Sequence, residues 1–135
     1  MKIIIPDDYQ NVVMHLDCFK LLKDHQVVIY NETEQDIDKL AAKFSDADAL
    51  VLIRERTEIS EALLSHLPNL KLISQTGKIS HHLDLNACTR HKVAVAEGIG
   101  SPVAPSELTW ALIMNAVRQL PQAIQAMKDG KWQVN

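Results

Sequence analysis

The sequence predicts an α/β fold, in which a flavodoxin-like, doubly wound parallel sheet of five strands is followed by interdomain or dimerisation helices. Short runs rich in β-branched residues alternate with helical patterns, which indicates right-handed β-α-β crossovers. Runs such as Val51-Leu52-Ile53 are apolar without alternation, as suits a parallel sheet that is covered on both faces. The predicted strands are residues 2–5, 26–30, 49–53, 71–74 and 93–96.

The helices between the later strands carry their own start signals. Four apolar residues between 37 and 44 recur at i, i+3, i+4 and i+7, the spacing of one helical face. Thr33 is placed to cap this helix, with Asp36 in the last position of a capping box. Two further helices are predicted at 61–67 after a Ser60 cap and at 85–91 after an Asp84 cap.

The end of the chain has a different pattern. From residue 103 to 120, apolar side chains cover almost the whole helical wheel, so this helix needs burial on most sides. Pro121 begins a second helix and Gly130 ends it. We therefore expect a flavodoxin-like substrate domain over 1–100, followed by crossing helices over 101–135.

Composition limits the classes of protein to consider. The chain has 135 residues, 47% apolar and 23% charged, which is the balance of one globular domain. A net charge of −3 gives no reason to bind nucleic acid or an anionic membrane, and no apolar stretch approaches the ~20 residues that span a bilayer. Residues 1–8 do not follow a signal-peptide pattern. Cys18 and Cys88 are isolated, so we expect buried thiols and a cytoplasmic protein.

Three segments together carry a family resemblance. They are Gln75-Thr76-Gly77-Lys78, the turn 97–102 (Glu-Gly-Ile-Gly-Ser-Pro), and the run from 106 through 132. In combination they resemble the first third of a D-isomer-specific 2-hydroxyacid dehydrogenase, close to the D-3-phosphoglycerate dehydrogenase branch. The resemblance implies the substrate-side domain of an NAD-dependent oxidoreductase that interconverts a 2-hydroxy acid and a 2-oxo acid.

The resemblance also implies what lies elsewhere. In the family, a glycine-rich dinucleotide fingerprint opens soon after a match to Gly130-Lys131-Trp132, and here the sequence ends at Asn135. The proton-transferring histidine, its carboxylate partner and the catalytic arginine belong to that later part of the family's chain. We therefore assign no catalytic residue, and we expect this polypeptide alone to be inactive and to bind NAD weakly. The family's helix that corresponds to 103–120 implies a homodimer.

Three candidate binding residues follow from the resemblance. In the family, the loop that matches 75–78 holds the substrate carboxylate with backbone amides, which implies roles for Gly77 and Lys78, and Lys78 also lies near the cofactor. Arg54 matches an arginine that points into the substrate cleft, where a guanidinium can grip a carboxylate or phosphate. The plainer alternatives are a simple β-α turn at 75–78 and an Arg54 that is paired with Glu55 or Glu58.

The sequence departs from the commoner family pattern beside this loop. The family pattern has a second glycine and an Asp-Asn pair, where this chain has Ile79, His81 and His82. Gln75 stands where phosphoglycerate-type relatives often carry a further arginine, which argues against a phosphorylated substrate.

Other functions fit less well. Gly98-Ile99-Gly100 lacks the third glycine of a dinucleotide fingerprint and is better explained as a hinge. A response-regulator receiver needs an aspartate where Arg54 stands and a lysine where Glu97 stands. A flavodoxin needs a phosphate loop after the first strand, and residues 6–9 do not form one. No set of His, Cys, Asp and Glu residues has the spacing of metal ligands, so no metal site is expected. A stand-alone binding or scaffolding protein that derives from such a dehydrogenase stays open.

Overall fold

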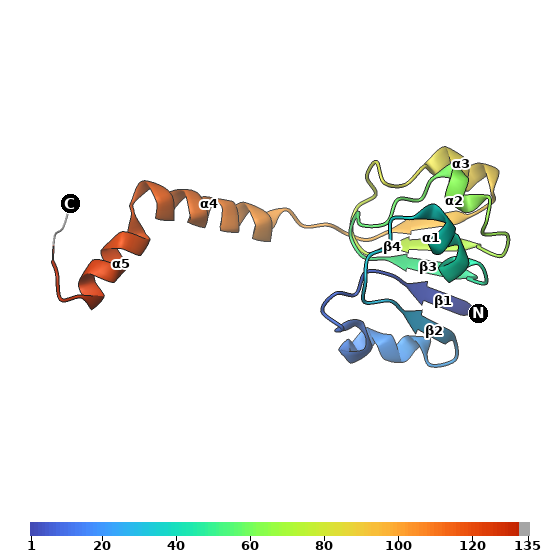
Figure 1. Ribbon diagram of the computed structural model, residues 1–135, viewed down its shortest axis with the longest axis horizontal. Helices are drawn as coiled ribbons and strands as arrows, with labels where there is room; N and C mark the ends of the chain where they lie inside the picture. The colour runs from blue at the N-terminus through green and yellow to red at the C-terminus, as the bar shows by residue number, and fades with distance from the viewer. Residues whose placement is uncertain (133–135) are drawn as a thin grey trace. The chain divides into compact units, whose positions relative to one another are not determined.

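The computed structural model describes residues 1–132, and the chain divides into two compact units, Met1–Gly100 and Ser101–Asn135. The first unit contains a five-stranded sheet with its helices, and the second contains two helices (Figure 1). Each unit is described separately below.

The sheet of the first unit is entirely parallel, with the strand order β2-β1-β3-β4-β5. This order confirms the predicted doubly wound α/β fold, since the chain first adds β2 on one side of β1 and then builds outward on the other side. Strands β4 and β5 each start one residue later than predicted. The strands are β1 (Lys2–Ile5), β2 (Gln26–Ile29), β3 (Ala49–Leu52), β4 (Leu72–Gln75) and β5 (Ala94–Glu97).

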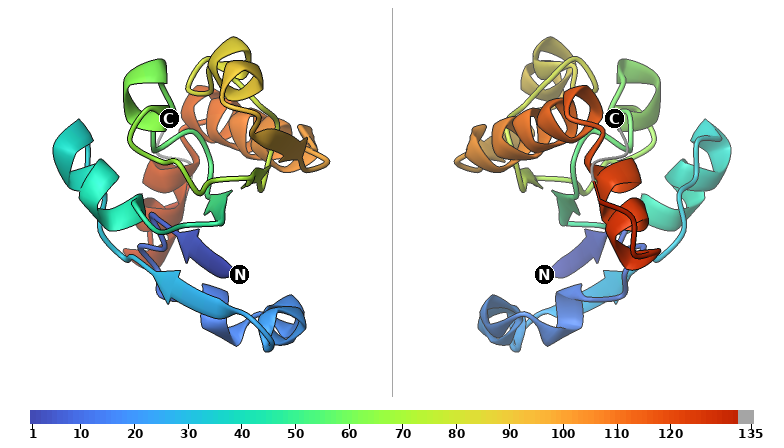
Figure 2. Two further views of the ribbon diagram at one scale, coloured as in Figure 1. Left: turned by 90° about the vertical axis from the view of Figure 1, so that its right-hand side faces the viewer. Right: turned by 90° about the vertical axis from the view of Figure 1, so that its left-hand side faces the viewer.

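Three helices cover one face of this sheet. They are α1 (Ile37–Phe44), α2 (Glu61–Leu64) and α3 (Leu85–Arg90). Alternate strand residues face these helices and form the main core, including Ile4, Leu50 and Ile73, which are fully buried. Figure 2 shows α1 and α2 on this side of the twisted sheet.

The opposite face is covered less completely within the unit. Two short 3-10 helices, Val13–His15 and Asp17–Leu22, lie there against β1 and its neighbours. Val51, Ile53 and Leu72 on this face are only half-buried. The expectation of a sheet covered on both faces therefore holds for one face only, because the link between β1 and β2 forms short 3-10 turns instead of a full α-helix.

The helix caps agree with the sequence at two of three positions. Ser60 accepts from the Leu63 amide at 3.4 Å and Asp84 from the Ala87 amide at 2.9 Å, as predicted. The predicted Thr33 cap is wrong: α1 begins later, and Asp36 caps it by accepting from the Lys39 amide at 3.0 Å. Thr33 instead donates to Asp7 Oδ1 at 2.8 Å, so a distant carboxylate displaces the local cap.

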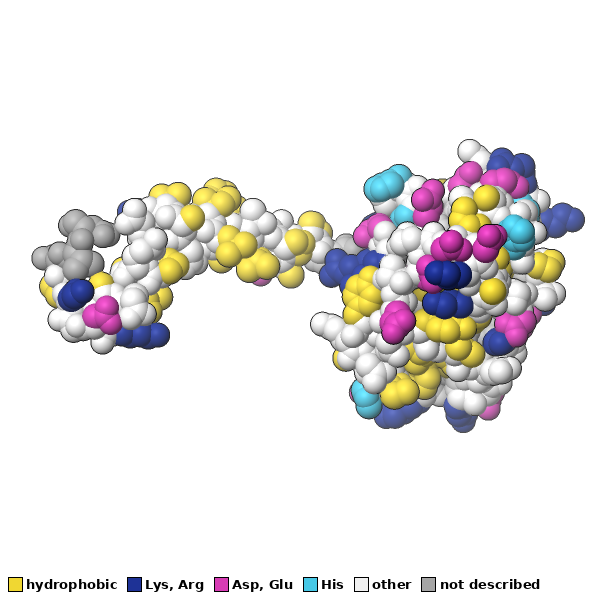
Figure 3. Space-filling view, in the orientation of Figure 1, with side chains coloured by type: hydrophobic (Ala, Val, Ile, Leu, Met, Phe, Trp, Pro, Cys, Tyr) yellow, Lys and Arg dark blue, Asp and Glu magenta, His cyan; other side chains and the backbone are white. Residues whose placement is uncertain are grey.

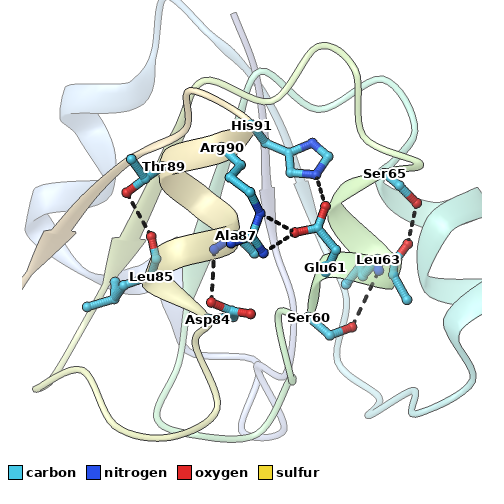
Figure 4. Close-up of polar contacts among 11 residues, drawn as sticks. Ser60, Glu61, Leu63, Ser65, Asp84, Leu85, Ala87, Thr89, Arg90 and His91 are labelled. Atoms are coloured by element: carbon cyan, nitrogen blue, oxygen red, sulfur yellow. Dashed lines mark hydrogen bonds and ion pairs between the residues drawn. The ribbon is translucent and has the colours of Figure 1, made fainter.

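A charged cluster joins α2 to α3 at the surface (Figure 4). The Glu61 carboxylate accepts from Arg90 Nε at 3.0 Å and contacts His91 Nε2 at 2.6 Å. These two partners hold the pKa of Glu61 below its ordinary value, His91 contributing most and Arg90 next. Glu61 thus ties the start of one helix to the end of the other.

The second unit consists of α4 (Val103–Val117) and α5 (Leu120–Lys128). The predicted break before Pro121 occurs slightly earlier, at Gln119, which has a φ of 48°. Gly130 ends the second helix with a φ of 71°. No α4 side chain is buried, and Trp110 is 65% exposed; Figure 3 shows hydrophobic side chains along this helix.

Two cysteines were expected to be buried. Cys88 is buried, whereas Cys18 is exposed on a short 3-10 helix that lies on the less covered face of the sheet, so that expectation is wrong for Cys18. Across residues 1–132, no helix is both long and apolar enough to cross a membrane. Among the described residues, no three or more His, Cys, Asp or Glu side chains lie together so that they could hold a metal ion.

Candidate functional site

The candidate site lies at the carboxyl ends of β3 and β4. These strands are neighbours, with Leu52 opposite Gln75, and the Thr76 amide donates to the Leu52 carbonyl at 3.0 Å. Arg54 and Gly77 each lie two residues beyond that pair, so both loops leave the sheet at the same edge. This is the edge where open α/β sheets bind ligands.

Arg54 is exposed and has a φ of 59°, a left-handed conformation that is unusual for a residue with a side chain. Within residues 1–132 its guanidinium forms no ion pair, so the alternative of a pairing with Glu55 or Glu58 does not occur. Arg54 therefore presents an uncommitted cation at the sheet edge.

Arg56 is placed differently, although it lies only two residues away. Its guanidinium lies over the Tyr9 ring, 4.0 Å from the ring centroid, and donates to the Asp7 carbonyl at 2.7 Å. These contacts fix Arg56 to the loop that follows β1. Of the two arginines, Arg54 is the one available to a ligand.

The loop after β4 exposes backbone donors. Neither the Gly77 amide nor the Lys78 amide has an acceptor among the residues that the structure describes. Gly77 has an ordinary φ, and a Cβ placed on it would meet no atom within 4 Å. Two adjacent unpaired amides beside open space are able to hold an anion.

The Lys78 side chain is already engaged. Its ammonium lies 2.5 Å from Glu97 Oε1, and Glu97 Oε2 accepts from the Ile79 amide at 3.0 Å. The hydrogen bond from Lys78, followed by that from Ile79, lowers the pKa of Glu97. Lys78 thus offers a ligand its amide, while Glu97 holds the ammonium and the loop.

Gly98 is required by close packing. A Cβ on Gly98 would lie 2.8 Å from the Thr76 carbonyl oxygen, and the Gly98 amide donates to the Gln75 and Gly77 carbonyls at 2.9 and 3.0 Å. Its φ is not positive, so the glycine is explained here by close packing against the loop after β4. The hinge interpretation of residues 98–100 stays a prediction.

Comparison with known proteins agrees with this arrangement. Residues 9–131 match the family model of the D-isomer specific 2-hydroxyacid dehydrogenase catalytic domain. The chain belongs to this family. The human D-3-phosphoglycerate dehydrogenase is 30% identical over 86% of the chain, and the chain spans 22% of that protein's length.

Two solved structures extend the comparison with the dehydrogenase family. A phosphoglycerate oxidoreductase from Vibrio cholerae is 56% identical, with a TM-score of 0.82. The match covers the whole of this chain and 43% of the oxidoreductase. A D-lactate dehydrogenase from Aquifex aeolicus, solved with NAD and lactic acid, shares the fold at 24% identity with a TM-score of 0.74. The match covers 98% of this chain and 39% of the lactate dehydrogenase. The chain therefore corresponds to less than half of these dehydrogenases.

A buried polar network in this dehydrogenase domain was not found from the sequence. Gln75 is 1% exposed and donates from Nε2 to the Arg54 carbonyl at 3.0 Å. His82 is 4% exposed, and its Nε2 lies 3.2 Å from Gln75 Oε1. Burial is the main cause that lowers the pKa of His82. Both positions depart from the commoner family pattern, but that departure alone does not indicate that the two side chains meet.

A second buried group lies at the end of β1. The Asp7 carboxylate is 1% exposed and accepts from the Thr57 hydroxyl at 2.6 Å as well as from Thr33. Asp8 accepts from the Val12 and Val13 amides at 3.1 and 3.0 Å. These acids hold the loop after β1 and tie it to Thr33 and Thr57.

Proposed function

We propose that this chain is the substrate-side domain of an NAD-dependent oxidoreductase that interconverts a 2-hydroxy acid and a 2-oxo acid. The Gly77 and Lys78 amides bind the substrate carboxylate, and Arg54 supplies the positive charge beside them. Family membership supports the class of reaction, and the site geometry supports the binding role.

The observation that carries this proposal is that the fold itself does not need Gly77 to be a glycine. Its φ is ordinary, and its Cβ position is empty. A glycine in such a place costs conformational entropy without any benefit to the domain. That cost is explained if a ligand must approach the backbone amides more closely than a Cβ would allow.

The division of labour follows from these residues. Amides and a guanidinium bind and orient an acid, but they do not remove its proton, so we assign the chain no catalytic residue. NAD would supply the hydride acceptor, and the Lys78 backbone would lie next to it. The other cationic group on this loop, the Lys78 ammonium, is neutralised by Glu97, which leaves Arg54 as the charge that selects anions.

We further propose a homodimer that forms through α4. The helix carries large apolar side chains around its circumference, and α5 leaves them exposed within the unit. Apolar surface of this extent is typical of an interface.

The binding proposal is tested with paired glycine variants of the 135-residue chain. Gly77→Ala should weaken the binding of pyruvate, measured by NMR titration, while it raises the stability by about 0.4–1 kcal/mol, because alanine restricts the unfolded chain. The matched control Gly98→Ala should lower the stability by about 1–3 kcal/mol, because its Cβ meets the Thr76 carbonyl.

Two further measurements complete the test. 3-Phosphoglycerate in place of pyruvate reports whether a phosphorylated acid is preferred, and addition of NAD with a 2-hydroxy acid should give no turnover from this polypeptide. Unchanged pyruvate affinity in Gly77→Ala would contradict the proposed carboxylate site.

A further inference from the structure

Gln75 and His82, the buried polar pair at the site, have only one consistent hydrogen-bond arrangement. Gln75 Nε2 faces the Arg54 carbonyl at 3.0 Å, because the opposite amide orientation would set two oxygen acceptors against each other. Gln75 Oε1 therefore faces His82 Nε2 at 3.2 Å, and this nitrogen must carry the hydrogen. The three groups form a directed chain from His82 to Gln75 to the backbone of Arg54.

The surroundings of the other ring nitrogen favour the neutral form of His82. His82 Nδ1 is buried and has no hydrogen-bond partner among the described residues. A proton there would be a buried donor with no acceptor, which burial penalises. Desolvation is the main cause that lowers the pKa of His82, Glu55 raises the pKa, and His81 lowers it further. The direction of the hydrogen-bond chain is therefore fixed at neutral pH.

The series of hydrogen bonds from His82 through Gln75 ends at Arg54, which is the strained residue of the site. Arg54 has a φ of 59°, a conformation that persists only when its surroundings hold it. Gln75 contacts its carbonyl from the neighbouring strand end. Because φ determines the direction in which Cβ leaves the backbone, this contact also sets where the Arg54 guanidinium can reach.

We propose that Gln75 and His82 are positioning residues, which hold Arg54 in the left-handed conformation that presents its guanidinium to the substrate acid. His82 orients the Gln75 amide, and Gln75 holds the Arg54 backbone. The inference rests on the proposed function, because it assumes that Arg54 binds the acid.

A double-mutant cycle in the 135-residue chain tests this coupling. Gln75→Met keeps the side-chain volume and removes both hydrogen bonds. We expect it to shift the backbone NMR resonances of Arg54 in the ligand-free protein and to weaken pyruvate binding about tenfold, as for a lost charge-assisted contact. In an Arg54→Ala background, the same substitution should cause little further loss, since the residue it positions is already absent.

A second pair of variants covers the case in which Gln75→Met does not fold. His82→Leu removes the donor to Gln75 and should reproduce the loss, whereas His82→Gln restores a donor and should recover binding. His81→Ala, next to it and exposed, is the control and should bind pyruvate as the wild type does.

The outcomes separate this inference from the proposed function. Equal losses from Gln75→Met in the wild-type and Arg54→Ala backgrounds, or unchanged Arg54 resonances in the ligand-free variant, would overturn the positioning role. If Arg54→Ala binds pyruvate as well as the wild type does, the proposed role of Arg54 fails, while the ligand-free resonances still decide whether Gln75 controls its backbone.

Discussion

Asp7 and Arg54 follow two central strands of the sheet, and both have positive φ angles, of 66° and 59°. Such a conformation costs an L-residue roughly 1–2 kcal/mol. Hydrogen bonds hold both residues: Arg56 and Thr57 contact Asp7, and Gln75 contacts Arg54. Two of the five described residues other than glycine that have a positive φ thus lie at the edge of the candidate site.

Substitutions at Arg54 separate this strain from the binding function. Arg54→Gly should be more stable than Arg54→Ala by about 1 kcal/mol, because glycine adopts a positive φ without a steric penalty. Both variants should lose affinity for pyruvate, by about 1.5–3 kcal/mol for a charge-assisted contact. Urea denaturation gives the first quantity and NMR titration the second. Equal stability of the two variants would indicate that residue 54 relaxes to a negative φ once its side chain is removed.

The family resemblance implied binding roles for Arg54 and Gly77, and both residues follow strands at the same edge of the sheet. The side chain that holds the Arg54 carbonyl was not predicted. The link from His82 through Gln75 could not be predicted, because it depends on two side chains that meet only when the loop after β4 folds back over the strand end. Thr33 failed for the same reason, since its partner Asp7 lies far away in the sequence.

Among the elements, α2 and α3 depend on each other through the Glu61 cluster. Helix α2 spans only Glu61–Leu64, which is too short to be stable alone. Its buried leucines and the contacts of Glu61 with Arg90 and His91 fix it against α3. The caps Ser60 and Asp84 could be predicted from the sequence because capping involves neighbouring residues. The Glu61 cluster could not, because its residues are far apart in the sequence.

The Glu61 cluster predicts a dependence of stability on pH. The pKa of Glu61 is lower in the folded chain than its ordinary value of about 4.3, so its contribution is present above that value and is lost as the pH falls through the folded pKa. Glu61→Gln should therefore be less stable than the wild type near neutral pH, and the difference should shrink in acid. Thermal unfolding between pH 7 and pH 3 measures this.

Glu58 provides the control for that experiment. It is exposed and forms no ion pair in the part of the chain that the structure describes. Glu58→Gln removes a carboxylate outside the cluster, and its stability difference from the wild type is the reference for that of Glu61→Gln. A constant difference for Glu61→Gln relative to this reference would show that the cluster contributes through packing alone.

For the whole molecule, the sequence predicted the class of fold and the change of character after residue 100. Both predictions rest on hydrophobic patterns that extend over many residues, which local exceptions do not disturb. The incomplete cover on one face of the sheet was not predictable, because the segment between β1 and β2 carries helical residues but forms only short 3-10 turns.

The apolar surface of α4 predicts self-association. We expect the chain to sediment as a dimer at micromolar concentrations, because Trp110 and Met114 are exposed beside other large apolar side chains. Trp110→Glu combined with Met114→Glu should give a monomer, with circular dichroism confirming that it is folded. Ser106→Glu combined with Asn115→Glu adds the same charge at polar positions of α4 and should remain dimeric. A monomeric wild type would contradict the interface.

The strand order also determines how the sheet can assemble as the chain is synthesised. After β1 and β2 have paired, each later strand is added to a strand that is already complete: β3 to β1, β4 to β3 and β5 to β4. The largest separation in sequence is the step from β1 to β3, and the other three pairings join strands that are consecutive in the chain. The sheet is complete at Glu97, and Gly98 then packs against Thr76. The ligand loop and its packing partner are therefore both synthesised before α4 and α5.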